Sequence, residues 1–316
     1  MEVMFHPCLS VNKISQKVWT DSDEIWQRCS VCDTDKMIRF GEDPDSDPAT
    51  IIFKLEFAVE MSCGSCEQAV IDVLLDVPGV RMLEIAADQE RLVLESTLPI
   101  EKLQDLIETS GRKAVLKGVG SSAGEHHGAA VTMLEGRGPE CGVVRLMQVS
   151  SDCCLIEGTV DRLTPGLHGL HVHSLGDLTA DWLSCGGHFN PRGGAHGEPT
   201  DENSHAGDLG NILADEHGSA SFRMASNKIH VWNIIGRSVV VTEREDDLGK
   251  GNHELSLVTG NSGEGVAWGI IARSAGLFQN PKRICTCDGV TLWEEREKQI
   301  AGKGVQHKPA TMLANL

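Results

Sequence analysis

The sequence predicts a multidomain fold, in which a small α+β domain with a βαββαβ order precedes an all-β antiparallel sandwich or barrel. Two patterns predict it. Residues 51–120 alternate short β-rich runs with two runs at helical spacing, whereas residues 121–275 hold short strand-like runs broken by Gly and Pro turns. Residues 1–50 end in an acidic, proline-bearing stretch typical of a mobile extension, and residues 276–316 carry too few apolar residues for a core, which predicts a flexible tail.

Residues 51–120 predict a two-layer, ferredoxin-like α+β domain. Pro78 and Gly79 end the first helix, Pro99 opens the second, and Gly111 terminates it. The expected elements, in order, are a strand at 51–59, a helix carrying Val70, Val73, Leu74 and Val77, strands at 80–86 and 91–95, a helix carrying Leu103, Leu106 and Ile107, and a strand at 113–117.

The composition argues against several classes of protein. The formal net charge of −18 predicts no nucleic-acid partner, because phosphate neutralisation needs clustered Lys and Arg. No apolar run approaches the ~20 residues of a membrane span, and the first 25 residues show neither a signal peptide nor a transit peptide. Eleven cysteines, several of them adjacent, suit thiol or metal chemistry better than a secreted disulfide framework. We therefore expect a cytoplasmic location, with the mitochondrial intermembrane space and the nucleus left open.

Cys63 and Cys66 form a Cys-x-x-Cys on the loop between the first expected strand and helix. Two thiolates at this spacing suit Cu(I), and a helix N-terminus lowers thiol pKa. Half of a structural zinc site, a thioredoxin-type redox pair and inert cysteines remain alternatives. The motif and its domain resemble the heavy-metal-associated domain of small copper chaperones. A second Cys-x-x-Cys, at Cys29 and Cys32, lacks flanking elements and is interpreted as incidental.

Histidines dominate the middle of the chain. His171 and His173 fall on one face of a predicted strand, because side chains alternate along strands. Three further histidines and a carboxylate follow at ligand-like intervals, a donor set typical of a closed tetrahedral zinc site: His188, His196, His205 and Asp208.

The runs Gly166–His173, Gly187–Pro191, Gly207–Asn211 and Asp246–Gly249 closely resemble Cu,Zn superoxide dismutase. The resemblance covers most of residues 128–275. It implies a Greek-key β-barrel and Zn(II) held by the four residues just named.

Four positions depart from the dismutases. Thr242 replaces a copper-ligating histidine and Gly265 replaces an arginine that guides superoxide, so we expect no dismutase activity and interpret His171 and His173 as a vestigial copper site. Trp182 and Trp268 occupy the positions that form the family's intra-subunit disulfide. Cys185, three residues after Trp182, is a free-thiol candidate.

A copper-chaperone domain, a dismutase-like domain and a late Cys285-Thr-Cys287 together resemble the family of copper chaperones for superoxide dismutase. The resemblance implies that Cys63 and Cys66 collect Cu(I) and that Cys285 and Cys287 act on Cu,Zn superoxide dismutase, inserting copper and promoting its disulfide. It also implies a heterodimer with that enzyme through the dismutase-like domain. The docking residues would include Ile235, Gly236 and Arg237, with the segment at 269–271.

Two other functions compete. One is an active Cu,Zn superoxide dismutase with a fused metal-collecting domain, and the other is a metal-buffering protein without a dedicated partner. A homodimer and a membrane copper transporter as copper source are further expectations. The sequence leaves open whether the two cysteine pairs share one copper or act in turn, and incidental tail cysteines remain the alternative for Cys285 and Cys287.

Overall fold

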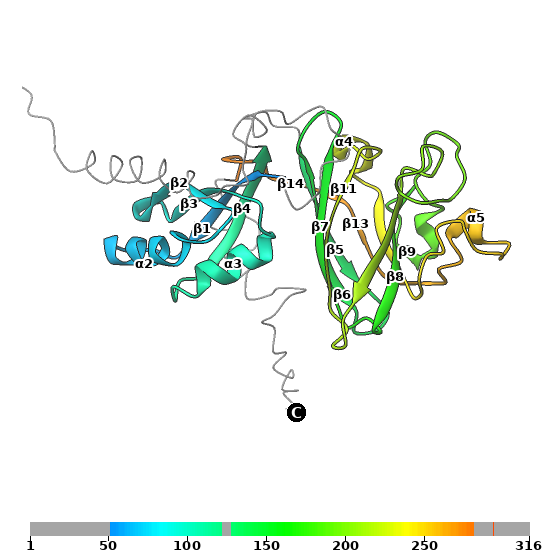
Figure 1. Ribbon diagram of the computed structural model, residues 1–316, viewed down its shortest axis with the longest axis horizontal. Helices are drawn as coiled ribbons and strands as arrows, with labels where there is room; N and C mark the ends of the chain where they lie inside the picture. The colour runs from blue at the N-terminus through cyan, green and yellow to red at the C-terminus, as the bar shows by residue number, and fades with distance from the viewer. Residues whose placement is uncertain (1–50, 122–127, 281–292, 294–316) are drawn as a thin grey trace, which may run out of the picture. The chain divides into compact units, whose positions relative to one another are not determined.

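The computed structural model describes residues 51–121, 128–280 and 293 (Figure 1). The expectations for residues 1–50, for the tail and for Cys285 and Cys287 lie outside these ranges. Within them, every helix is too short or too polar to traverse a lipid bilayer.

The first domain has the predicted order β1–α2–β2–β3–α3–β4. Its four strands form one antiparallel sheet in the order β2-β3-β1-β4. A short 3-10 turn, η2 (Ala87–Gln89), joins β2 to β3. The bounds are β1 Phe53–Val59, α2 Gly64–Leu74, β2 Val80–Ala86, β3 Arg91–Ser96, α3 Ile100–Glu108 and β4 Ala114–Ser121.

Alternate side chains of β1 and apolar side chains of the two helices form the core of this domain. Alternate residues of β1, from Phe53 to Val59, are fully buried, and α2 and α3 lie on the same side of the sheet (Figure 1). These helices bury Val70, Leu74, Leu103 and Ile107. Helix α2 ends at Leu74, before the expected Val77, because Pro78 disfavours helical geometry at the residue before it.

The second domain is a nearly closed antiparallel barrel, as predicted. Strand β8 pairs with β10 and β12 instead of its predecessor β7, which gives the Greek-key crossovers. The strands are β5 Ala129–Glu135, β6 Cys141–Gln148, β7 Cys154–Asp161, β8 Gly166–His173, β9 Thr179–Trp182, β10 Asp208–Ala214, β11 Ala220–Ser226, β12 Ser238–Thr242, β13 Gly265–Ile270 and β14 Ala272–Ser274. Two four-residue helices, α4 (Val231–Ile234) and α5 (Ser256–Thr259), and the 3-10 turn η3 (Leu183–Cys185) lie in its connections.

Inward-facing aliphatic residues fill the barrel, among them Leu146, Ile156, Val172 and Val239. The register places Asp208 of β10 opposite His171 of β8. His171, His173 and Asp208 therefore extend from strands that pack on the core, whereas His188, His196 and His205 lie in the connection between η3 and β10.

Candidate metal centres

The first centre is a pair of thiols at the start of α2. Cys63 is the N-cap residue of the helix, and its Sγ lies 3.2 Å from the Sγ of Cys66. Cys63 is exposed, whereas Cys66 is 3 % exposed and belongs to the domain core. One sulfur is thus held by packing while the other faces solvent.

Local hydrogen bonds make the exposed sulfur acidic. Contacts with the Ser65 hydroxyl, at 3.0 Å, and with the Cys66 thiol lower the pKa of Cys63 to about 6. At neutral pH Cys63 is therefore largely a thiolate, the form that binds metal. A buried sulfur beside an exposed thiolate fits a soft metal ion that a partner protein must be able to reach.

The second centre lies in the barrel. The Oδ1 atom of Asp208 lies 2.7 Å from Nδ1 of His188, 3.0 Å from Nδ1 of His196 and 3.2 Å from Nδ1 of His205. Zinc bonds of about 2.0–2.1 Å in a tetrahedron place ligand atoms roughly 3.3 Å apart. All four side chains are buried, and their three distances to Asp208 are near this spacing, which supports zinc binding. The set whose ligand atoms all lie within 4.8 Å of one another contains His171 instead of His205.

The pKa values of the expected zinc ligands in the barrel bear on metal binding. Burial raises the pKa of the Asp208 carboxyl, but the three imidazoles beside it outweigh that effect and hold the pKa well below its usual range. Burial, with His171 nearby, lowers the pKa of His188 to about 4, so its ring is neutral at pH 7. For His196, burial lowers the pKa, but Asp208 and Asp246 raise it to about 9. Zinc would displace that proton on binding.

Asp246 joins the zinc ligands to the neighbouring histidines. Its two carboxylate oxygens lie 2.8 Å from Nε2 of His196 and 2.9 Å from Nε2 of His171, and the side chain is fully buried. It orients both rings, as carboxylates commonly do behind metal-binding imidazoles. Asp246 belongs to the motif Asp246–Gly249, but the sequence alone did not predict a role for it.

His171 and His173 remain arranged as metal donors. Nδ1 of His171 and Nε2 of His173 are buried without a hydrogen-bond partner, and the His171 and His188 rings stack with centroids 4.0 Å apart. His171, His188, His196 and Asp208 offer ligand atoms within 4.8 Å of one another. The geometry supports a hydrogen-bonded role for His171 through Asp246.

Thr242 does not add a metal ligand to His171 and His173. Its hydroxyl lies 3.3 Å from the carbonyl oxygens of both Gly169 and Arg244 and donates to the main chain. The backbone thus occupies the hydroxyl, and a neutral hydroxyl is in any case a poor ligand for cupric ion. Thr242 therefore does not supply the nitrogen that a copper-ligating histidine would supply at this position.

The two tryptophans belong to one small apolar cluster. Cys185 and Val240 are fully buried, Trp268 is 8 % exposed, and Trp182 packs against them. A Cβ atom at Gly265 would lie 2.5 Å from Cγ of Trp182. The Trp182 indole therefore occupies the space beside Gly265 where a side chain would begin.

The expected docking residues lie at the end of α4. Ile235 and Arg237 are half-buried and Gly236 is exposed. The Arg237 guanidinium lies 4.1 Å from the Phe189 ring centroid and donates a 2.8 Å hydrogen bond to the Asn233 carbonyl, so it holds this loop together.

Comparisons with known proteins cover both domains. The heavy-metal-associated domain family matches residues 56–113, and the family described as copper/zinc superoxide dismutase matches residues 140–271. The copper chaperone for superoxide dismutase of Mus musculus is 57% identical over 79% of this chain and 91% of its own length. That of Homo sapiens is 55% identical over 82% of this chain and 95% of its own length. A chloroplastic protein of the same name from Oryza sativa subsp. japonica is 35% identical over 76% of this chain and 70% of its own length.

Proposed function

Because this chain belongs to the family of copper chaperones for superoxide dismutase, we propose that it binds copper through Cys63 and Cys66 and delivers it to Cu,Zn superoxide dismutase. The relatives are named as chaperones and not as dismutases. The active-dismutase alternative therefore loses to the chaperone function.

One observation carries this proposal. Cys63 is an exposed thiol with a pKa of about 6, and it lies 3.2 Å from a second sulfur in the core of a heavy-metal-associated domain. A carrier must hold its metal against solvent yet release it to another protein. A pair with one packed sulfur and one accessible thiolate supports both requirements, and sulfur ligands favour Cu(I) over harder ions.

The barrel contributes zinc binding and recognition. Zn(II) held by His188, His196, His205 and Asp208 would tie β10 to the long connection that follows β8. The surface around Ile235 and Gly236, held in place by Arg237, docks on the target as a heterodimer. A second copy of this chain competing for that surface would give a homodimer.

Cys285 and Cys287 act on the target after docking. Once an oxidant outside this chain has joined Cys285 and Cys287 in a disulfide, they exchange with two target thiols through a mixed disulfide, so that the target gains a disulfide as Cys285 and Cys287 become thiols. A spacing of one residue supports exchange over stable bridging. The thiol pairs need a reducing compartment to collect metal, which supports a cytoplasmic location and copper supply from a membrane transporter.

Activation of metal-depleted, zinc-loaded dismutase tests this function. The copper-loaded chain should activate it under limiting copper, in the presence of a Cu(I) chelator that blocks free transfer. Replacing Cys63 and Cys66 with Ser should abolish activation, and replacing Cys285 and Cys287 should reduce it. Cys141→Ser is the matched control, because it removes a partly exposed thiol outside both pairs. Equal activation by all three variants would contradict the proposal.

A further inference from the structure

The outer face of the barrel strands β6 and β7 is apolar and buried. Successive side chains of a strand point to opposite faces, and Ile156 and Val160 of β7 belong to the barrel core. Leu155, which points to the outer face, is nevertheless fully buried. It packs together with Met147 of β6 in the core cluster of the first domain. A strand that buries apolar side chains on both faces indicates that a second layer covers it.

Three charged residues form a row beside this apolar patch. Glu157 of β7 lies opposite Arg145 of β6 and opposite Arg223 of β11. Glu157 is only 5 % exposed, and its Oε2 atom lies 4.0 Å from Nε of Arg223. Buried charged groups need hydrogen-bond partners. For both Glu157 and Arg223, the first domain supplies these partners.

Glu157 provides the N-terminal cap that α3 lacks. The first N–H groups of a helix have no partner within the helix, and the N-cap residue of α3 is Pro99, whose side chain makes no capping hydrogen bond. Oε1 of Glu157 accepts a 2.6 Å hydrogen bond from the N–H of Ile100, the first residue of α3. A carboxylate at this end also complements the positive end of the helix dipole. The barrel therefore stabilises a helix of the other domain.

Arg223 binds the backbone beside this helix. Its guanidinium group donates hydrogen bonds to the carbonyl oxygens of Thr97 and, at 3.0 Å, of Ile51. The same group lies 4.6 Å from the ring centroid of Phe53, within the range of a cation–π interaction. The planar fork of donors on one Arg side chain can serve two carbonyl groups at once. One side chain of the barrel thus contacts both the start of β1 and the segment that precedes α3.

These contacts lie at one end of the sheet of the first domain. Phe53 of β1 lies opposite Ser96 of β3 and opposite Ser121 of β4. The thiol pair follows the other end of β1, which ends at Val59. At about 3.3 Å per residue, the two ends of β1 are roughly 20 Å apart. The contacts with the barrel therefore leave the thiol end of the domain free, and Cys63 is exposed.

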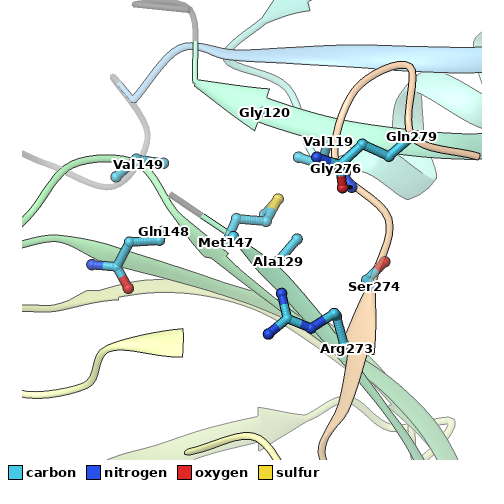
Figure 2. Close-up of a pocket in the computed structure, with 11 residues that line it drawn as sticks. Val119, Gly120, Ala129, Met147, Gln148, Val149, Arg273, Ser274, Gly276 and Gln279 are labelled. Carbon is cyan, nitrogen blue, oxygen red and sulfur yellow. Dashed lines mark hydrogen bonds between the residues drawn. The ribbon is translucent and has the colours of Figure 1, made fainter. Parts of the chain in front are cut away.

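The connection between the domains favours contact within one molecule. Figure 2 shows Val119 of β4 and Met147 of β6 beside the same cavity, of about 90 Å³. Seven residues separate Ser121 from Ala129, and seven residues span at most about 25 Å. So short a connection gives the first domain a high effective concentration at the barrel of its own chain.

We propose that the outer face of β6, β7 and β11 is a docking surface for the first domain of the same chain, in which Glu157 caps α3 and Arg223 holds the backbone beside it. The surface holds the first domain by the end of its sheet that is remote from the thiols. The two domains therefore move as one body, while Cys63 stays accessible to a partner protein. This inference goes beyond the proposed copper delivery and does not depend on it.

NMR relaxation of backbone amides in the full-length, zinc-loaded chain tests the docking. Amides of residues 51–121 and of residues 128–280 should report one rotational correlation time. Replacing both Glu157 and Arg223 with Ala should free the smaller first domain and shorten its correlation time at least about 1.5-fold, because domains without a firm interface move independently. The matched control replaces Glu135 and Arg137, an exposed carboxylate and an exposed guanidinium of the same barrel.

Two different correlation times in the wild type would overturn the docking. An unchanged single correlation time in the double variant would overturn the roles of Glu157 and Arg223. Because the measurement involves neither copper nor dismutase, its failure is distinguishable from failure of copper delivery.

Hydrogen exchange at the Ile100 amide tests the cap with milder variants. Glu157→Ala should raise the exchange rate at least about tenfold through loss of local protection, whereas Glu157→Gln, which keeps an acceptor oxygen, should retain part of the protection. Glu135→Ala should change nothing. Equal exchange in the wild type and in Glu157→Ala would overturn the capping role. Protection that grows with protein concentration would assign the surface to a second copy of the chain and overturn docking within one molecule.

Discussion

Gly265 gives the sharpest structural prediction, because the Trp182 indole occupies the space next to its Cα atom. A methyl group added by Gly265→Ala would lie 2.5 Å from Cγ, 2.8 Å from Cβ and 3.0 Å from Cδ1 of Trp182. Real Cβ atoms do not approach other atoms this closely. The backbone of β13 or the indole must therefore move, which disturbs the cluster around Cys185 and Trp268.

The cost follows from overpacking. Forcing an extra methyl group into a packed site costs about 1–3 kcal/mol. For a domain of about 150 residues, each kcal/mol lowers the Tm by roughly 2–4 °C, so Gly265→Ala should lower the Tm of the barrel transition by about 2–12 °C. In a Trp182→Ala background the same change should be neutral or stabilise by about 0.4–1 kcal/mol, because alanine restricts the unfolded chain.

Calorimetry measures the coupling between Gly265→Ala and Trp182→Ala. It compares the Tm of the wild type, both single variants and the double variant at one fixed zinc concentration. Zinc must be fixed because bound metal shifts the Tm by itself. Gly187→Ala is the control: no atom lies within 4 Å of its added Cβ, so it should not lower the Tm. Additive effects of Gly265→Ala and Trp182→Ala would refute the claim that the Trp182 indole limits the space at Gly265.

Three further results are expected. In the metal-free chain, the alkylation rate of Cys63 should be half-maximal near pH 6. Because its pKa is lowered, the reactive thiolate persists above pH 6 and is lost as the pH falls below it. A midpoint near pH 9 would contradict the hydrogen bonding to Ser65. Asp208→Asn should weaken zinc binding more than about 100-fold in chelator competition, because this carboxylate contacts all three imidazoles; Asp215→Asn, on an exposed turn, should leave affinity unchanged. Thr242→His should create a Cu(II) electron paramagnetic resonance signal with nitrogen coupling, which Thr242→Val should not.

The sequence alone predicted the features that depend on the local spacing of apolar residues and on short motifs. Apolar spacing and the Pro and Gly signals predicted the βαββαβ order of residues 51–120, and the Gly-rich runs predicted an antiparallel barrel. The structure brings the four expected zinc ligands together around one carboxylate oxygen. Metal ligation imposes spacing on the sequence, which is why a pattern could indicate the set.

Other features depend on contacts between distant residues, which no local pattern records. The Trp182 indole packs on Gly265, 83 positions later in the chain, so two positions that look unrelated in the sequence are in contact. Glu56 and Phe278, which share a hydrogen bond, are 222 positions apart, and no pattern in the sequence links them. Asp246 was missed because a carboxylate behind two imidazoles has no spacing signature of its own.

The central claim is that Cys63 and Cys66 supply the copper that matures dismutase. The most direct test is dismutase activity after zinc-loaded apo-enzyme is mixed with one equivalent of the Cu(I)-loaded chain in the presence of excess Cu(I) chelator. The account predicts activation by the wild type and by Cys141→Ser, and none by the chain in which Cys63 and Cys66 are both Ser. Full activation by that double variant would contradict it.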